Sequence, residues 1–311
     1  MKKILYLLFV ILIGANLNNV AAQVDVETDS GSKDEKTDTV KIKPTLVFKG
    51  NQSLNFTQTS FNNWAAGGAN SIAGVATANL KLDYKETNFT WEAVVDMAYG
   101  LSYQQDNFMK NNDKLDFTTK FGLRSSKKWF YSLAVQLKTQ FDRGYKSYPP
   151  LDRNKYTSRF MAPGYLISSL GMDYKPTENL SFMLSPFSAK CTFVLDTILS
   201  NRGDYGVTPG RKSLSEIGSL IKATYSKKFK SNSTINTTVE LFTSWINHFG
   251  NIDVSCEFDW NIKLNKWFSS RVYAKLLYDD DIKIKDETTG EMIGPYLQFK
   301  QMLGLGISLS F

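Results

Sequence analysis

The sequence has few of the residues on which several protein classes depend. Its 311 residues include two cysteines, one histidine and eight prolines. Two cysteines cannot build a disulfide framework, and one histidine leaves little basis for imidazole zinc sites or catalytic triads. The few prolines and 20 glycines argue against a fibrous or low-complexity chain. The net charge of +7 is interspersed along the chain, so nucleic acid is not an expected partner.

Aromatic residues are abundant, at 14% of the chain, and 42% of residues are hydrophobic, which excludes wholesale disorder. Lys2 and Lys3 precede an apolar run of 12 residues, too short to span a bilayer. Val20 and Ala22 stand where a signal peptidase requires small residues. We therefore expect a cleaved signal peptide at residues 1–22, a flexible periplasmic leader at 23–43 and the folded domain at 44–311.

The apolar residues of the folded domain recur at every second position. This alternation is clear over residues 89–103, 129–141 and 252–264, and it is the pattern of β-strands. The alternating segments are longer than the five or six residues usual in soluble sheets and suit strands that cross a bilayer. Twelve segments are expected: 45–58, 71–84, 89–104, 113–125, 128–142, 159–175, 179–194, 212–227, 232–247, 250–264, 267–283 and 296–311.

The connections between these segments alternate in length. Those after even segments are short, whereas those after odd segments are mostly long, with a tight corner at residues 248–249 as the exception. Outer-membrane barrels place short turns in the periplasm and long loops outside. The sequence therefore predicts an all-β protein, a transmembrane antiparallel up-and-down β-barrel of about 12 strands with both termini periplasmic.

Aromatic residues at segment ends predict two membrane-interface girdles. Near the short turns these are Tyr84, Trp91, Trp129, Tyr131, Tyr174, Tyr225 and Trp267, and near the long loops Tyr99, Tyr103, Phe141, Trp245 and Tyr278. The final segment alternates Leu or Ile with Gly or Ser and stops at Phe311. A terminal aromatic of this kind resembles the signal read by the outer-membrane assembly machinery.

Several stretches resemble one barrel family. They are Asn63-Trp64-Ala65-Ala66-Gly67-Gly68-Ala69-Asn70-Ser71, Lys138-Thr139-Gln140-Phe141, Leu170-Gly171-Met172-Asp173-Tyr174-Lys175-Pro176 and Tyr278-Asp279-Asp280-Asp281-Ile282. The chain resembles the domain-of-unknown-function 3078 family of Bacteroidota outer-membrane β-barrel proteins. This resemblance implies an outer-membrane location and supplies no catalytic residue.

The loop around Trp64, Gly67 and Gly68 is a candidate contact site. The two glycines permit positive φ and close backbone approach, and Trp64 is a flat apolar anchor. The loop either folds into the barrel mouth to bind or gate a ligand, or is a tight hairpin in which Trp64 fills a gap. Asp279-Asp280-Asp281 is either a divalent-cation ligand set or a solvated acidic loop.

Enzymatic readings have little support. His248 lies near Ser244 and Asn247, as an outer-membrane phospholipase would require, but no surrounding motif accompanies it. Cys191 and Cys256 fall on segments that are not neighbours, so no disulfide is expected. No enzyme activity, cofactor or metal is predicted. Asp38-Thr39-Val40 and Asp196-Thr197-Ile198 resemble O-glycosylation triplets, a pattern that also occurs by chance.

Charged residues on the polar face of the strands predict a lumen crossed by ion pairs. The acidic members are Glu92, Asp96, Asp253 and Glu257, and the basic members are Lys120, Arg124, Lys138, Arg271 and Lys275. Twelve strands leave a bore between a filled barrel and an open porin. We expect a largely closed lumen and a non-enzymatic accessory or structural subunit of an outer-membrane complex, in contact with lipid, lipopolysaccharide and other outer-membrane proteins. The alternative is a narrow channel for small polar solutes.

Overall fold

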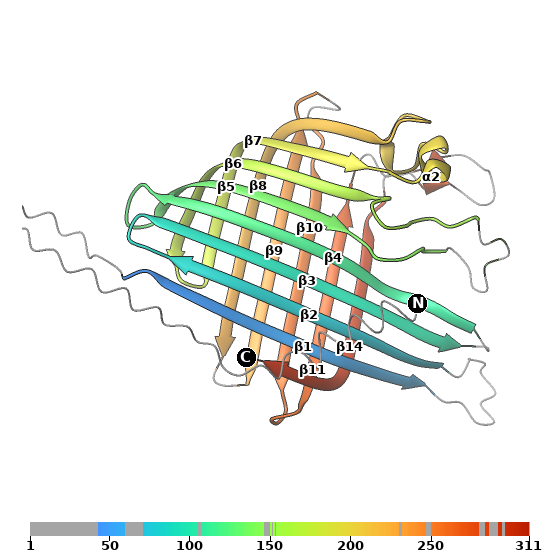
Figure 1. Ribbon diagram of the computed structural model, residues 1–311, viewed down its shortest axis with the longest axis horizontal. Helices are drawn as coiled ribbons and strands as arrows, with labels where there is room; N and C mark the ends of the chain where they lie inside the picture. Colours follow the sequence, from blue (N-terminus) through green and yellow to red (C-terminus); the bar gives the residue numbers. More distant parts are fainter. Residues whose placement is uncertain are drawn as a thin grey trace, which may run out of the picture.

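The computed structural model describes residues 43–59, 71–104, 107–145, 150, 152, 154–229, 232–246, 250–279, 284–285, 292–293 and 296–310. Twelve antiparallel strands form one closed barrel in the order β1-β14-β11-β10-β9-β8-β7-β6-β5-β4-β3-β2 (Figure 1). Each strand from β1 to β11 pairs with the next strand in sequence. The last barrel strand, β14, pairs with β11 and closes the barrel against β1. The up-and-down barrel predicted from the sequence is confirmed.

The strand bounds agree with the predicted segments to within a few residues at most positions. The strands are β1 Thr45–Thr59, β2 Ser71–Lys85, β3 Phe89–Gln104, β4 Asn107–Arg124, β5 Trp129–Thr139, β6 Gly164–Thr177, β7 Leu180–Phe193, β8 Ser213–Phe229, β9 Ser233–Ser244, β10 Asp253–Lys263, β11 Phe268–Tyr278 and β14 Gln298–Ser310. A separate two-stranded ribbon pairs β12 (Ile284–Lys285) with β13 (Met292–Ile293).

Three connections differ from the sequence prediction. The corner expected at residues 248–249 is longer than predicted, because β9 ends at Ser244 and β10 begins at Asp253. The loop expected at residues 105–112 is a tight connection, because β4 begins at Asn107 and pairs with β3 as far as Gln104. Conversely, β5 ends at Thr139 and β6 begins at Gly164, so the connection between them is longer than expected. That loop and the one after β7 fold on each other, and the latter contains the short helix α2 (Thr197–Asn201) and the 3-10 turn η1 (Asp204–Gly206). No helix in the described residues is long and apolar enough to cross a membrane.

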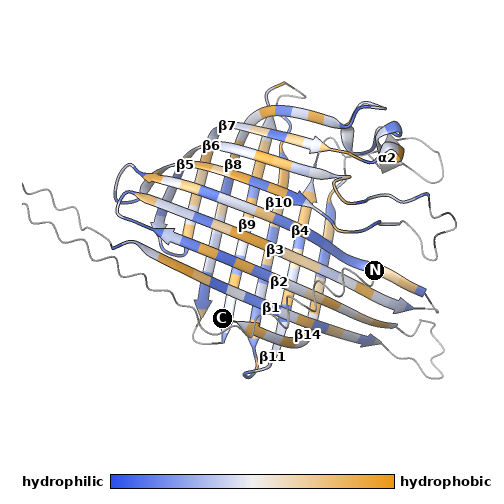
Figure 2. Ribbon diagram, in the orientation of Figure 1, coloured by the Kyte–Doolittle hydropathy of each residue, from blue (hydrophilic) through white to orange (hydrophobic). Residues whose placement is uncertain are grey.

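Alternation gives the barrel a polar inside and an apolar outside. Figure 2 shows hydrophilic and hydrophobic residues alternating along the strands. In β14, Leu303, Leu305 and Ile307 are exposed, whereas Gly304 and Gly306 are buried against β1. A Cβ on Gly306 would lie 2.1 Å from the carbonyl oxygen of Leu54, so this close approach requires glycine.

Some aromatic residues of the predicted girdles are exposed on the outer wall, whereas Tyr99 is buried. Tyr131 and Trp267 expose 58% and 61% of their surface, as outward-facing rings should. Tyr99 exposes only 4%, and its hydroxyl donates to Asp142 at 3.2 Å. The loop that follows β5 reaches back to β3 and covers this ring, which the local pattern of β3 could not reveal.

A β-bulge in β7 changes which residues face inward. The pairing register with β8 shifts between Ser185 and Ser188, at Pro186. Proline has no N–H for the strand ladder and is tolerated at bulges. Beyond this bulge Ser188, Lys190 and Thr192 are buried. Lys190 therefore enters the barrel interior through a local irregularity of the strand.

Candidate functional site

The candidate site is the barrel interior, where charged side chains from strands far apart in the ring meet. The clearest case joins Lys114 on β4 to Glu257 on β10, with 3.0 Å between Nζ and Oε2. These two strands lie six positions apart in either direction around the ring of twelve. Only side chains that cross the bore can connect diametrically opposite strands. The lumen is therefore bridged at this level.

Glu257 is shared by two cations. Its other oxygen accepts from Lys275, its register partner on β11, at 2.7 Å. Lys114 in turn lies 2.8 Å from Asp96 on β3 and 3.3 Å from Asp116 on β4. The Glu257 cluster, made of these five side chains, thus combines two lysines with three carboxylates.

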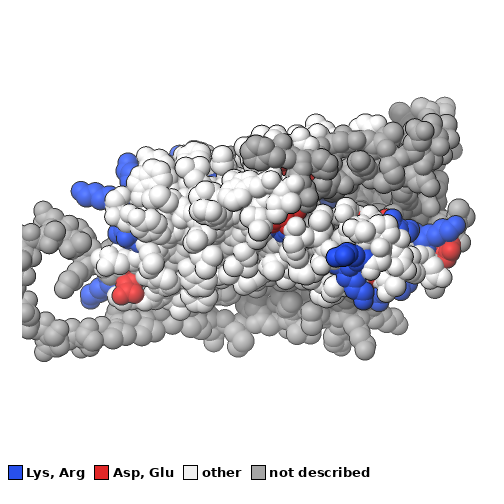
Figure 3. Space-filling view, turned by 90° about the horizontal axis from the view of Figure 1, so that it is seen from above, with Lys and Arg blue, Asp and Glu red and all other residues white. Residues whose placement is uncertain are grey.

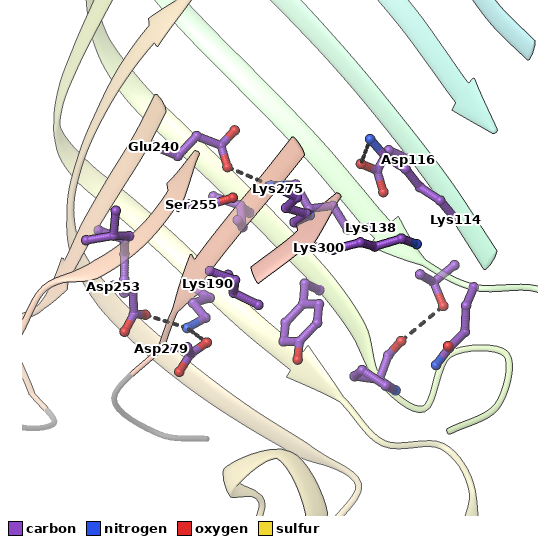
Figure 4. Close-up of a pocket in the computed structure, with 18 of the residues that line it drawn as sticks. Lys114, Asp116, Lys138, Lys190, Glu240, Asp253, Ser255, Lys275, Asp279 and Lys300 are labelled. Carbon is purple, nitrogen blue, oxygen red and sulfur yellow. Dashed lines mark hydrogen bonds and ion pairs between the residues drawn. The ribbon is translucent and has the colours of Figure 1, made fainter. Parts of the chain in front are cut away.

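A second bridge links Lys138 on β5 to Glu240 on β9, at 2.6 Å. Glu240 also accepts from Lys222 on the neighbouring strand β8, at 2.6 Å. A third group is centred on Lys190, which lies 2.7 Å from Asp253 and 3.4 Å from Asp279. Figure 4 shows these contacts converging from β5, β7, β9, β10 and the end of β11.

Nearer the short turns, a further set of pairs crosses between non-adjacent strands. Lys175 on β6 reaches Glu92 on β3 at 3.0 Å, and Lys120 on β4 reaches Asp173 on β6 at 2.8 Å. Asp173 also accepts from Ser181 at 2.5 Å. Asp173 exposes 1% of its surface, so its charge is balanced by these donors rather than by water.

The structure brings most of the charged residues named from the sequence into ion pairs, although with different partners in several cases. Glu92 contacts Lys81 and Lys175, although Lys120 is its register partner. Arg271 pairs with Asp259 at 2.8 Å. Arg124 is different, because its Nε donates to the Thr87 carbonyl oxygen and its guanidinium lies over the Phe130 ring. The prediction of an ion pair for Arg124 has no support within the described residues.

Asp279 is buried, exposing 8%, and is paired with Lys190, so the solvated acidic loop expected from the sequence is wrong for this residue. Asp280 and Asp281 lie outside the described residues, as do Trp64, Gly67, Gly68, His248 and Phe311. The predicted signal peptide and leader also fall there, apart from Lys43. In the part of the chain that the structure describes, no group of His, Cys, Asp or Glu could hold a metal ion, and both cysteines are free.

The lumen contains a cavity of about 290 Å³ next to these bridges. Its walls combine charged residues with apolar ones. Lys300 from β14 also borders it, and its ammonium donates to the Asn112 side-chain oxygen at 3.0 Å. The apolar members of the wall are Pro163, Tyr165, Ile167, Leu220, Phe242, Val254, Tyr273 and Leu277.

The long-loop end has a folded unit of its own, which we call the loop unit and define as residues 141–145, 154–163 and 194–212. Its small hydrophobic core is formed by Tyr156, Ala162, Val194, Leu199 and Val207. In Figure 1 it lies around α2, where β6 begins and β7 ends. The loops after β5 and β7 are thus held together by packing, as a domain interior is.

Asp196 is the polar centre of the loop unit. Its carboxylate caps α2 by accepting from the backbone N–H groups of Ile198 and Leu199, at 2.9 and 3.2 Å. It also accepts from the Tyr156 hydroxyl at 2.7 Å and from Arg159 at 3.0 Å. Burial raises the pKa of Asp196, but these hydrogen bonds outweigh it and hold the pKa below its usual value.

Comparisons with known proteins assign no activity to the chain. No curated protein matches the chain. Among solved structures, the translocator domain of autotransporter NalP from Neisseria meningitidis is 10% identical, with 98% of this chain and 96% of that chain covered and a TM-score of 0.32. The NanC porin is 8% identical, with coverage of 85% and 98% and a TM-score of 0.36.

The outer-membrane protein OmpT of Vibrio cholerae is also 8% identical, with coverage of 86% and 99% and a TM-score of 0.28. Similarities this low carry no information on substrate or reaction. A family model described as a protein of unknown function, DUF3078, matches residues 56–145, which confirms the family predicted from the sequence. The match spans 90 of the 311 residues, from β1 to the loop after β5.

Proposed function

We propose that the protein is an integral outer-membrane barrel with a lumen closed by ion pairs, and that it acts without catalysis as an accessory or structural subunit of an outer-membrane complex. The observation that carries closure is the contact between Lys114 and Glu257 on opposite strands. An ion pair that spans the full bore leaves little continuous space for solutes at that level.

The charges of the bridges support a closed state rather than a selective pore. Channels that select ions by charge line the pore with rings of one sign. In this lumen lysines and carboxylates alternate around the same cluster, as Lys114, Asp96 and Glu257 illustrate. Removing one partner of such a buried pair leaves the other charge without a counterion, and this destabilises the folded protein.

The loop unit supports the accessory role. It is a packed surface at the long-loop end, and it presents Phe160, Leu195 and Ile198 with 53%, 50% and 42% of their surface exposed. Exposed apolar groups on a well-packed element are typical of protein contact sites. We infer that partners, including other outer-membrane proteins, bind at this end, while lipid and lipopolysaccharide surround the wall.

Planar-bilayer recording tests closure. Wild-type protein should give no stable porin-like conductance. Replacing Glu257→Gln removes the shared carboxylate and leaves Lys114 and Lys275 repelling each other, so conductance should appear or rise at least severalfold. The matched control is Asp259→Asn on the same strand, since Asp259 pairs only with its neighbour-strand partner Arg271 among the ion pairs of the described residues and bridges no bore.

Large stable conductance of the wild-type protein would overturn closure. A small, steady conductance that Glu257→Gln leaves unchanged would instead support the second candidate, a narrow channel for small polar solutes. The observation that favours this candidate is the lumen cavity of about 290 Å³.

Purification in mild detergent tests the accessory role. Wild-type protein should carry partner proteins in a fixed ratio, and the double change Phe160→Ser with Ile198→Ser should reduce their yield severalfold. Leu303→Ser with Leu305→Ser, on the exposed outer face of β14, is the control and should leave the ratio unchanged. Wild-type protein that purifies alone would contradict this role.

A further inference from the structure

The short turns at the opposite end of the barrel carry an excess of lysine. Five turns join β2–β3, β4–β5, β6–β7, β8–β9 and β10–β11, and four of them bear exposed lysines in the turn or at the adjoining strand end. Figure 3 shows basic side chains at this left-hand end of the molecule. The lysine ring consists of Lys85, Lys127, Lys128, Lys227, Lys228, Lys263 and Lys266.

Few acids balance this ring. The exposed carboxylates in the same turns are Glu86 and Glu178, and Glu86 already accepts from the Tyr84 hydroxyl at 3.2 Å. Within the described residues no lysine of the ring forms an ion pair, and the Lys227 ammonium lies over the Phe229 ring, 5.0 Å from its centroid. The positive charge at this rim is therefore not neutralised by the chain around it.

Aromatic side chains lie just inside the ring, on the strand ends. Trp129 and Tyr174 have ring centroids 4.7 Å apart, and Tyr84 and Phe89 lie 6.0 Å apart. Trp267 exposes 61% of its surface. Tyr and Trp concentrate at the level of lipid headgroups, where lysine ammonium groups can extend from an apolar wall toward phosphate.

We propose that the lysine ring binds the phosphate groups of the phospholipid leaflet at the short-turn rim and selects anionic headgroups. The ring lysines occur in turns on both sides of the barrel, from β2–β3 to β10–β11, and do not form one patch. A leaflet surrounds the barrel and contacts every turn, whereas a docked protein contacts one side. Each lysine near an anionic bilayer surface strengthens association by about fivefold.

Lipid enrichment measured on the full-length folded protein tests this proposal. The protein is reconstituted into phosphatidylcholine vesicles with a minor fraction of phosphatidylglycerol, and the bound lipid is then quantified by native mass spectrometry. Wild-type protein should enrich phosphatidylglycerol about fivefold or more over the bulk. The ring variant Lys128→Gln, Lys228→Gln, Lys266→Gln should lose most of this enrichment.

The matched control removes three positive charges at the long-loop end, by Lys155→Gln, Arg211→Gln and Lys212→Gln, all of which are exposed. It should keep wild-type enrichment. Replacing the three ring lysines by arginine should restore it, which separates charge from loss of folding. Folding of each variant is checked by the migration difference between boiled and unboiled samples.

Equal enrichment by the wild-type protein and the ring variant would overturn the proposal, as would equal loss in the long-loop control. A protein partner that co-purifies with the wild type and is lost from the ring variant, without any lipid enrichment, would assign the ring to that partner and also overturn it. The proposal rests on the membrane insertion that the proposed function includes, but neither result depends on whether the lumen conducts, so lumen closure and lipid selection fail independently.

Discussion

The two ends of the barrel treat their charges in opposite ways. At the long-loop end Asp196, Arg159 and Tyr156 satisfy one another around a small hydrophobic core. At the short-turn end the lysine ring projects from tight hairpins that have no core of their own. A charge that finds its partner within the chain orders a loop, whereas a charge without one remains available to the surroundings. The long-loop end is therefore ordered by its internal contacts, whereas the lysines of the short-turn end are available to bind anions.

The largest effect on this comparison should come from Asp196→Ala. The change removes the cap of α2 and leaves the buried Tyr156 hydroxyl without its acceptor, so the loop unit should lose about 2–4 kcal/mol of local stability. Hydrogen exchange of residues 194–212 measures this directly. Protection of the barrel strands should stay at the wild-type level, since the affected contacts lie within the loops.

Unchanged exchange in the loop unit of Asp196→Ala would show that its apolar core alone orders these loops. The apolar contribution can be measured separately with Leu199→Ala, because Leu199 has no exposed surface. Removing such a side chain costs roughly 2–5 kcal/mol where the site cannot collapse.

Low pH should also destabilise the loop unit, but by less than Asp196→Ala does. Because the pKa of Asp196 in the folded loop unit lies below its unfolded value, its contribution is fully present above the unfolded pKa of about 3.9. That contribution is lost as the pH falls through the lower, folded pKa. Limited proteolysis of the loop unit should therefore accelerate below about pH 4, and in Asp196→Ala this pH dependence should be weaker.

The smallest effect should come from Asp204→Ala. Asp204 pairs with Arg202 at the surface of the same loop unit. Exposed ion pairs contribute roughly 0–1 kcal/mol, so hydrogen exchange should change little. A loss as large as that of Asp196→Ala would mean that charge in general, and not the buried hydrogen-bonded centre, orders this end.

The barrel was predictable because its signal is local. Each strand has to place apolar side chains on one face and polar ones on the other, so period-two alternation and strand length together predict a barrel with a polar inside and an apolar outside. Which charged side chains pair with one another in the lumen was harder to predict. Glu92 and Lys120 are neighbours in register, yet Glu92 contacts Lys175 and Lys120 contacts Asp173. Long lysine side chains can reach strands beyond their neighbours, and the shape of the bore selects among them.

Local irregularities caused other differences. The bulge at Pro186 changes the inward face of β7, so a strict alternation misplaces residues on one side of it. The loop after β5 covers Tyr99, which the pattern of β3 assigns to the interface. In β7 the cause is a register shift in the strand ladder. For Tyr99 it is a contact with a loop distant in sequence.

The sequence by itself determined the strand class, the up-and-down order, the short turns and the polar inner face, because each depends on residues a few positions apart. Only the tertiary structure decided that Lys114 meets Glu257 across the bore, that Asp279 is buried beside Lys190, and that two loops share a core around Leu199. These contacts join residues far apart in the chain. Their geometry is fixed by the closure of the barrel, which sets the distance between opposite walls and which side chains can meet across it.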